Sequence, residues 1–399
     1  MTASTPERTG KVATYCYQCV AGPDLLKVKV EDGVATAIEP NFDAQGVHPA
    51  DGRVCVKAFG LIQKAYNPNR VLAPMKRTNP KKGKDEDPGF VEITWDEALD
   101  LVAEKLTKVR AEGLLDRAGY PRLAASFGGG GTPTAYMGTF PAFLSAWGPV
   151  DLSFGSGQGV KCYHSEHLYG ELWHRAFIVC PDTPRTRYIV SFGSNIEASG
   201  GVCGVWRHAN ARVEQGVKRV QIEPHLSVTG GCSAEWVPIK PKTDAAFMHA
   251  MIYVLIHEND RERLDVPFLK HMTASGYLVG PNGYYLRDPD TRKPLVWDLT
   301  QGKAVPFDTP GNDPALDGRF TASGIEVGPD EAIFRHDGVE VATSFQMLLD
   351  HERTFTPEWA ETICEVPAAT IRRVANEYLD HAEVGATIEI EGRTLPFRP

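Results

Sequence analysis

Three cysteines near the N-terminus have the residue type and spacing for metal chemistry. Cys16 and Cys19 form a CxxC, and Cys55 lies in the glycine-flanked stretch GRVCVKAFG. Thiolates on tight loops bind iron–sulfur clusters or zinc. Structural zinc usually needs four closed ligands, and the sequence has no second CxxC. A thioredoxin-type CxxC begins a helix, whereas a strand-like run, LLKVKVEDG, follows this one. The spacing therefore favours an iron–sulfur cluster and leaves zinc, or no metal, open.

The elements around these cysteines are predicted to be short strands and turns. Asp32-Gly33 sits between alternating apolar and polar residues, which is a hairpin signal. Thr94, with Glu97 three residues later, forms a capping-box pattern and predicts the start of an amphipathic helix.

Further along, strands alternate with helices, which predicts an α/β fold with a doubly wound parallel sheet. Residues 275–345 are rich in Gly, Pro and Asp and read as irregular or short-stranded. The remaining segments divide into strands and helices: strands at 187–195 and 219–224, and helices at 207–218, 244–259 and, as a pair, 356–381.

Composition narrows the class of protein. A length of 399 residues allows two or three domains. The net charge is −9 and there is no Lys/Arg block, which argues against a nucleic-acid partner. No apolar run approaches the ~18–20 residues of a membrane span. The polar start MTASTPERTGKVATY has neither an apolar segment nor a twin arginine, so we expect a cytoplasmic protein.

The order of these motifs resembles the molybdopterin oxidoreductases of the dimethyl sulfoxide reductase family. The resemblance rests on the CxxC, the run LLKVKVEDGVATAIEP, the stretch GRVCVKAFGLIQKAYNPNRVLAPMKR and the helix ITWDEALDLVAEKL. Those enzymes open with a [4Fe–4S] domain whose pattern is CxxCxxxC and then a fourth Cys followed by x-Lys. Cys16, Cys19 and Cys55 match the first, second and fourth ligands. The third position falls on Pro23, so we expect Asp24 to replace it.

Two further groups of site residues follow from the resemblance. Lys57 matches the lysine between cluster and pterin. The stretches RYIVSFGSN, RVQIEP and PKTDAAF resemble the parts of the family that bind the pterin dinucleotide. Small residues after a strand also let the backbone approach a pyrophosphate. The expected dinucleotide contacts are Gly193, Ser194, Asn195, Glu223, Thr243 and Asp244.

The side chain that the protein gives to molybdenum is expected in the segment SFGSGQGVKCYHSEHLYGE. Cys162 has the best position, with Ser165 and then Ser156 as alternatives. His164 and His167 lie three residues apart and share one face of a helix, so they are expected to carry protons.

The resemblance implies a catalytic subunit with bis-molybdopterin guanine dinucleotide, holding molybdenum or tungsten, and a [4Fe–4S] cluster. The expected domains are 1–75 for the cluster, 76–120 with 350–399 for the first part of a discontinuous molybdopterin domain, and 121–349 for dinucleotide binding. The expected partners are an iron–sulfur electron-transfer subunit, a membrane anchor subunit on the cytoplasmic side and a small-molecule substrate. The family's C-terminal barrel is expected to be absent, and the chain alone to be inactive.

Several functions stay open. The N-terminal stretch CYQCVAGPD and the internal segment KCYHSEHLYGE are most similar to phenylacetyl-CoA:acceptor oxidoreductases, which oxidise a methylene group. Thiosulfate, polysulfide and tetrathionate reductases are the runner-up. A non-redox hydratase or transhydroxylase, and a non-catalytic electron-transfer subunit, are the rivals. A nicotinamide site is disfavoured, since no acid-ended strand follows the glycines of SFGGGGTPTAYMG at the usual distance.

Overall fold

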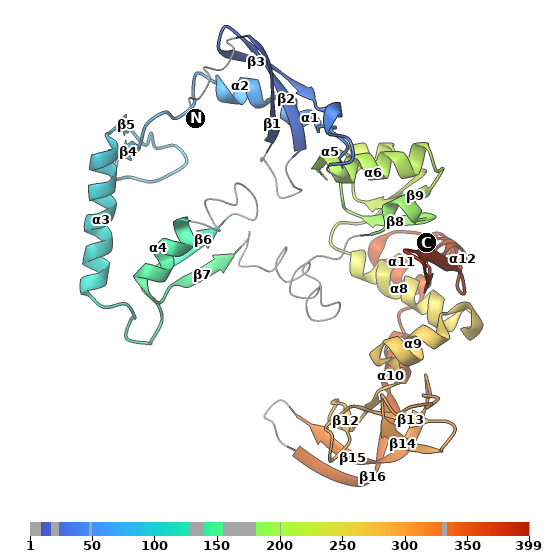
Figure 1. Ribbon diagram of the computed structural model, residues 1–399. Coiled ribbons are helices and arrows are strands. Elements are labelled where there is room, and N and C mark those ends of the chain that lie inside the picture. The colour runs from blue at the N-terminus through green and yellow to red at the C-terminus, as the bar shows by residue number, and fades with distance from the viewer. Residues whose placement is uncertain are drawn as a thin grey trace. The chain divides into compact units, whose positions relative to one another are not determined.

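The computed structural model of the chain describes residues 9–16, 24–47, 50–127, 139–154, 181–199, 201–328 and 333–398. It divides into two compact units, coloured along the chain in Figure 1. Unit 1 comprises Met1–Pro181 and Ser199–Arg207, and unit 2 comprises Asp182–Ala198 and His208–Pro399. No helix in the described ranges is long and apolar enough to cross a membrane.

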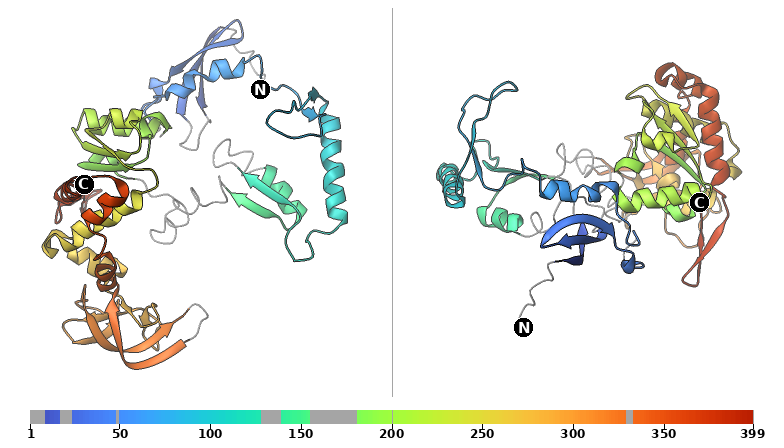
Figure 2. Two further views of the ribbon diagram at one scale, coloured as in Figure 1. Left: turned by 180° about the vertical axis from the view of Figure 1, so that it is seen from behind. Right: turned by 90° about the horizontal axis from the view of Figure 1, so that it is seen from above.

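Unit 1 begins with a small antiparallel sheet in the order β1-β2-β3. Asp32 and Gly33 join β2 to β3 with φ of 51° and 83°, the left-handed conformations of a tight hairpin turn, as the sequence predicted. Figures 1 and 2 show two short helices against this sheet. The elements are β1 (Gly10–Cys16), β2 (Asp24–Glu31), β3 (Val34–Pro40), η1 (Phe42–Ala44), α1 (Val56–Phe59) and α2 (Leu61–Ala65).

The rest of unit 1 holds one long helix and two short strand pairs. The helix α3 (Trp95–Ala111) begins as predicted, since Thr94 Oγ1 accepts a hydrogen bond from Glu97 N at 3.1 Å. None of its residues is buried. The other elements are the hairpin of β4 (Met75–Arg77) and β5 (Phe90–Glu92), the parallel pair of β6 (Ala124–Phe127) and β7 (Asp151–Phe154), and α4 (Phe140–Trp147).

The centre of unit 2 is a parallel three-stranded sheet in the order β10-β9-β8, which confirms the predicted parallel pairing. Three helices pack on it and enclose an apolar core that includes Val220, Ile222, Phe247, Ile371 and Val374. The strands are β8 (Tyr188–Phe192), β9 (Lys218–Glu223) and β10 (Glu235–Pro238), and the helices are α8 (Asp244–His257), α11 (Pro357–Cys364) and α12 (Ala368–His381). The segment before β8 contains η5 (Thr183–Arg185). The connection from β8 to β9 contains α5 (Ile196–Ser199) and α6 (Gly201–Val213), and the connection from β9 to β10 contains α7 (Val228–Gly231).

The amino ends of the three strands are held by α12. Tyr188 and Lys218, the first residues of β8 and β9, bind the Glu377 carboxylate at 2.7 and 2.8 Å. Arg373 binds both Glu377 and Glu235, the first residue of β10. Burial would raise the pKa of Glu377, but the hydrogen bonds from Lys218, Tyr188 and Arg373 outweigh it and lower the pKa to about 2. We call these five residues the amino-edge network.

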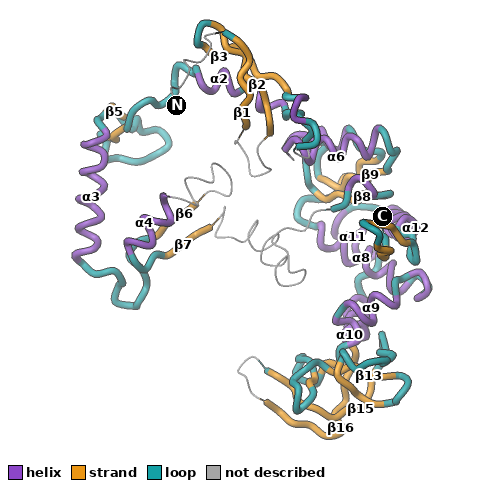
Figure 3. The backbone as a smooth tube through the Cα atoms, in the orientation of Figure 1, coloured by secondary structure: helices purple, strands orange, loops and turns teal. Residues whose placement is uncertain are grey.

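Residues 275–345, expected to be irregular or short-stranded, contain a four-stranded antiparallel sheet in the order β11-β16-β15-β12. Two of its strands are long, with 9 and 11 residues, so that expectation was wrong in part. Figure 3 shows this strand-rich region in orange. Its strands are β11 (Leu278–Val279), β12 (Leu286–Arg287), β13 (Leu295–Asp298), β14 (Lys303–Pro306), β15 (Arg319–Val327) and β16 (Ile333–Thr343). The remaining elements of unit 2 are η6 (Arg261–Arg263), α9 (Val266–Met272), η7 (Ala274–Gly276), α10 (Ser344–Glu352), β17 (Thr387–Ile390) and β18 (Arg393–Pro396).

Candidate functional site

Three loops of unit 2 leave the same edge of the central sheet. Because β8, β9 and β10 are parallel, the segments that follow Phe192, Glu223 and Pro238 all start at their carboxyl ends. Open α/β sheets bind ligands at this edge. The dinucleotide residues predicted from the sequence lie in these loops or at the strand end.

The loop after β8 is Gly193-Ser194-Asn195. Gly193 has φ of +59°, and none of the described residues lies within 4 Å of the position that a Cβ would take. Its N–H donates to Ile222 O at 2.9 Å, which fixes the loop to β9. Asn195 Oδ1 accepts from Thr229 Oγ1 at 2.9 Å. The loop is therefore tied down on its inner side while the space over Gly193 is open.

Glu223 ends β9 with a side chain directed into the protein. The residue is 3% exposed, and its two oxygens accept hydrogen bonds from Ser227 N at 2.8 Å and Gln221 Nε2 at 3.1 Å. Burial would raise the pKa of Glu223, but the hydrogen bonds from Ser227 and Gln221 outweigh it and hold the pKa below its ordinary value. A Cβ on Gly230 would lie 2.5 Å from Glu223 Oε1, so only glycine allows this approach. Glu223 thus shapes the turn after β9 as an ionised carboxylate.

A buried ion pair supports the same two loops. Arg219 of β9 is 2% exposed, and its guanidinium lies 2.7 Å from Glu197 in α5. It also donates to Ser233 Oγ at 2.9 Å and to Thr229 O at 3.0 Å. Burial, together with the adjacent Arg219, lowers the pKa of His208. This pair joins the segment after β8 to the segment after β9.

The third loop leads from β10 into α8. Thr243 is the N-cap of α8, and its hydroxyl donates to Lys240 O at 2.6 Å. Asp244 occupies the first helical turn and is partly exposed. Lys242 has φ of +69°, the left-handed region that favours glycine. The positive end of the α8 dipole and these polar groups lie where an anionic ligand is stabilised.

Two of the cysteines predicted to bind a cluster, Cys16 and Cys55, are described and lie in the N-terminal sheet and at the start of its helix. Cys16 ends β1 and is buried, and its backbone lies opposite Asp24 in the β1–β2 register. Cys55 is the N-cap of α1, and Lys57 is the exposed second residue of that helix. Cys16 and Ala58 of α1 belong to one apolar core, so β1 and α1 lie close together. Both cysteines are free thiols.

Several predicted site residues lie outside the described residues. They are Cys19 at the CxxC, Cys162 with its alternatives Ser156 and Ser165, and the histidines His164 and His167. Among the described cysteines that are not expected to bind metal, Cys364 is fully buried in the core of unit 2. Burial raises its pKa, so it is an apolar packing residue.

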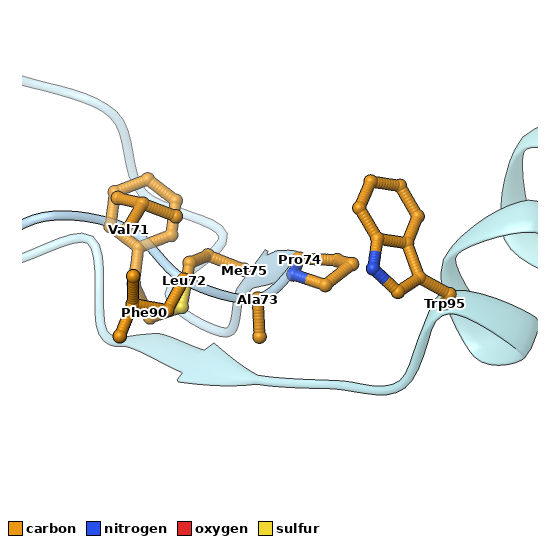
Figure 4. A pocket seen from close by; sticks show the side chains of 7 residues that line it. All are labelled: Val71, Leu72, Ala73, Pro74, Met75, Phe90 and Trp95. Carbon is orange, nitrogen blue, oxygen red and sulfur yellow. The ribbon is translucent and has the colours of Figure 1, made fainter. Parts of the chain in front are cut away.

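An apolar depression lies in unit 1 beside the β4–β5 hairpin. Figure 4 shows its lining, which includes Leu72, Met75, Phe90 and Trp95. The residues that line it have no titratable side chain, so it offers no group for acid–base or metal chemistry.

The residues that hold Glu223 and Asn195 in place were not predicted from the sequence. Gln221, Ser227 and Thr229 hold Glu223 and Asn195, and Arg219 with Glu197 lies behind them. One signal was visible: Ser227 and Thr229 are two hydroxyl residues, at alternate positions, in the segment that follows this strand. A charged residue inside the apolar strand RVQIE was a second signal, because a buried charge needs a partner.

Comparisons by sequence find a matching family model and two similar curated proteins. A family model described as "Molybdopterin oxidoreductase" matches residues 70–377. The chain is 28% identical over 386 residues to a sulfite dehydrogenase subunit of Allochromatium vinosum, covering 91% of this chain and 36% of that protein. It is 28% identical over 364 residues to the dimethyl sulfoxide reductase DmsA of Haemophilus influenzae, covering 88% and 38%.

A solved structure shows a similar fold. The acetylene hydratase from Pelobacter acetylenicus aligns with a TM-score of 0.50 and 16% identity, over 94% of this chain and 37% of that one. The chain therefore spans less than two fifths of the length of these three proteins.

Proposed function

We propose, since this chain belongs to the molybdopterin oxidoreductase family, that it binds a molybdopterin guanine dinucleotide along the carboxyl edge of β10-β9-β8. It would form part of the catalytic subunit of a molybdenum- or tungsten-dependent oxidoreductase. The observation that carries the proposal is the convergence of three loops at that edge. Among the described residues no atom blocks the Cβ side of Gly193, and the N–H of Gly193 is bonded to Ile222 O of β9.

The residues present suit a pyrophosphate and a guanine. Gly193 and Ser194 are exposed and leave the backbone accessible to phosphate oxygens. Thr243 and Asp244 stand at the start of α8, where a hydroxyl and a carboxylate can accept the N–H groups of a guanine edge. Glu223 is already satisfied by Ser227 and Gln221. We therefore assign it the role of holding the loop rather than reading the base.

The metal centre belongs to the segment around Cys162 in this proposal. Cys162 supplies the thiolate ligand, with Ser165 and Ser156 as alternatives, and His164 and His167 move protons to and from the substrate. The bound cofactor supplies two-electron redox chemistry with oxygen exchange; the chain supplies ligation, orientation and proton transfer.

Electron transfer is assigned to the N-terminal sheet. Cys16, Cys19 and Cys55 hold a [4Fe–4S] cluster, with Asp24 as the fourth ligand. Cys16 and α1 share one small core, which supports the pairing of the first and last ligands. Lys57 places a positive charge beside the cluster and stabilises added electron density. A partner iron–sulfur subunit receives or delivers the electrons, and a membrane anchor subunit on the cytoplasmic side completes the complex.

The substrate is a small molecule, and two classes compete. Oxidation of a phenylacetyl-CoA-type methylene is supported by the resemblance of the N-terminal stretch CYQCVAGPD and the internal segment KCYHSEHLYGE. Reduction or oxidation of sulfur oxo-compounds is favoured by the names of the two relatives above, a sulfite dehydrogenase and a dimethyl sulfoxide reductase. The hydratase shares the fold alone at 16% identity, so it adds no weight to a non-redox reaction.

The test is metal and nucleotide analysis of the anaerobically purified protein. Molybdenum or tungsten, iron and released guanine nucleotide are measured per chain in the wild type and in Asp244→Asn. We expect all three in the wild type and less nucleotide in the variant, with iron unchanged. Asp260→Asn, a change at the N-cap of η6, is the control. Iron without molybdenum, tungsten or nucleotide would instead indicate a non-catalytic electron-transfer subunit.

A substrate assay then separates the two classes. Turnover of sulfite or dimethyl sulfoxide with an artificial electron carrier, without turnover of phenylacetyl-CoA, would select the sulfur class. The opposite result would select methylene oxidation. Reaction without any electron carrier would contradict both and point to a hydratase or transhydroxylase.

A further inference from the structure

Two helices of unit 2 bring a pair of histidines and a buried glutamate together outside the candidate site. His249 is on α8, and His351 and Glu352 end α10. His249 Nδ1 lies 2.9 Å from Glu352 Oε2, and His351 Nε2 lies 4.0 Å from Glu352 Oε1. One nitrogen or oxygen of each residue lies within 4.8 Å of the others. We propose that these three side chains bind a divalent transition-metal ion, Zn²⁺, that links α8 to α10.

The donor set matches the chemistry of zinc. Two imidazoles and one carboxylate are a ligand set in which zinc keeps an open position for water. Bonds of about 2.0–2.2 Å place two ligand atoms of one ion no more than ~4.3 Å apart. Both histidine–glutamate distances already satisfy this limit. The side chain of His351 is 65% exposed, so it can rotate and bring its ring nitrogen within this limit of the ring nitrogen of His249.

The buried negative charge of Glu352 is a second reason to expect a bound cation. The side chain is 2% exposed. Among the described residues, the two imidazoles are the only basic groups recorded within 4.0 Å of this carboxylate. Neither is a permanently charged lysine or arginine, and a buried carboxylate without a permanent positive partner is costly. A bound Zn²⁺ supplies that partner.

An aromatic side chain packs against both imidazoles. The ring centroid of Phe355 lies 4.8 Å from that of His249 and 5.2 Å from that of His351. Trp359 also packs on Phe355, with ring centroids 4.8 Å apart. An apolar shell of this kind limits the access of water to a metal. The site thus has ligands from two helices and an aromatic neighbour shared by both histidines.

The site is separate from the proposed dinucleotide contacts at the start of α8. His249 follows Asp244 by five positions, or about 7.5 Å along the helix at ~1.5 Å per residue. An ion here would stabilise the contact between α8 and α10, since a ligand that binds only the folded state raises its stability.

Zinc binding by the full chain tests the proposal. The protein is stripped with a chelator and titrated with Zn²⁺ alone against a chromophoric competitor at pH 7.5. His351→Ala removes an exposed ligand with little risk to folding, and His271→Ala removes an equally exposed histidine from α9 as the matched control. Zinc on the N-terminal cysteines is common to all three proteins and cancels in the comparison.

We expect His351→Ala to lose one equivalent of bound zinc, or at least about 10-fold in affinity, while His271→Ala binds as the wild type does. Zinc should also raise the unfolding temperature of the wild type and of His271→Ala, but not that of His351→Ala. His351→Gln repeats the test if the alanine variant misfolds. Equal zinc binding by wild type and folded His351 variants would overturn the proposal and leave the three residues as a hydrogen-bonded cluster.

Discussion

The hydroxyl of Thr229 connects two of the three loops of the candidate site. It donates to Asn195 Oδ1 at 2.9 Å and accepts from Glu197 N at 3.1 Å. Thr229 itself is fully buried. Its role is therefore to keep the loop after β8 in one conformation before any ligand arrives, because preorganisation lowers the cost of binding.

Replacing this hydroxyl should weaken the fold and the site together. We expect Thr229→Val to lower the free energy of unfolding of unit 2 by about 1–3 kcal/mol, since Asn195 and Glu197 lose a buried partner. Thr362→Val is the control, because its hydroxyl bonds only Trp359 O on the surface of α11. Urea denaturation followed by tryptophan fluorescence measures both. Equal losses in the two variants would show that the Thr229 hydroxyl has no special role.

Two adjacent glycines provide a second test at the residue scale. A Cβ on Gly230 would lie 2.5 Å from Glu223 Oε1, whereas in the described part of the chain no atom lies within 4 Å of a Cβ on Gly231. Gly230→Ala should cost about 1–3 kcal/mol, the typical penalty of overpacking. Gly231→Ala should be close to neutral. Thermal unfolding of the two variants side by side distinguishes them, and a neutral Gly230→Ala would mean that Glu223 moves freely.

At this scale the sequence singled out residues on the loops, and their roles stay predictions. Gly193, Thr243 and Asp244 were singled out because the stretches that contain them resemble the dinucleotide-binding parts of the family. Thr229 did not stand out, since its bonds reach 34 residues back along the chain, to Asn195. Glu223 was found by position, but only the fold shows that its carboxylate is used internally.

At the scale of elements, one helix holds the amino edge of the sheet. The Glu377 carboxylate of α12 accepts hydrogen bonds from the first residues of β8 and β9, and Arg373 forms an ion pair with the first residue of β10. The strands are thus fixed at the edge opposite the candidate site.

The amino-edge network should make stability depend on pH. The pKa of Glu377 is about 2 in the folded protein, against an ordinary value of 4.5. The stabilisation is therefore fully present above about pH 4.5 and is lost as the pH falls toward 2. Glu377→Gln should cost about 1–2 kcal/mol at pH 7, a figure reduced for the partial exposure of the network. In this variant the free energy of unfolding should also fall less steeply between about pH 4.5 and pH 2, the acid limb of the stability curve.

Glu262→Gln, on the exposed turn η6, is the matched control and should leave that limb unchanged. Unfolding by urea at a series of pH values gives both curves. An acid limb that keeps its slope in Glu377→Gln would assign the pH dependence to other carboxylates.

The elements that the sequence predicted poorly share a physical cause. Strands β15 and β16 form one long hairpin-like pair, with a bulge between Ala322 and Gly324. The bulge breaks the alternation of apolar and polar residues, and glycines within both strands read as turn signals. By contrast, α8 is an almost uninterrupted apolar run and α12 has regular helical periodicity, and both were predicted within a few residues, as were β8 and β9. The third parallel strand, β10, was not predicted. The domain boundaries stay a prediction.

At the scale of the whole molecule, apolar packing is distributed unevenly. In unit 2 the core around Phe247 and Ile371 joins one sheet to three helices. In unit 1, α3 buries none of its 17 residues, and Trp95, Leu99 and Val102 are each more than half exposed. Because helices in water depend on packing for most of their stability, the two units should differ in local stability.

Hydrogen exchange should reveal that difference. We expect amides of α3 to exchange much faster than those of α8 and α12 in the 399-residue chain, since α3 can open without exposing a core. Exchange measured by mass spectrometry on peptic peptides tests this at one pH and temperature. Protection of α3 equal to that of α12 would show that another surface covers it.

The amino-edge network also has a consequence for protein synthesis. Arg373 and Glu235 are 138 residues apart, so β10 leaves the ribosome well before the helix that holds it. At ~5–20 residues per second, translation would take roughly 7–28 s to cover that interval. During this time the first residues of the three strands have no partner in α12, and the apolar core of the nascent sheet lacks the side chains that α11 and α12 contribute. A chaperone that acts on this protein should therefore engage it in that interval and release it once α12 has emerged.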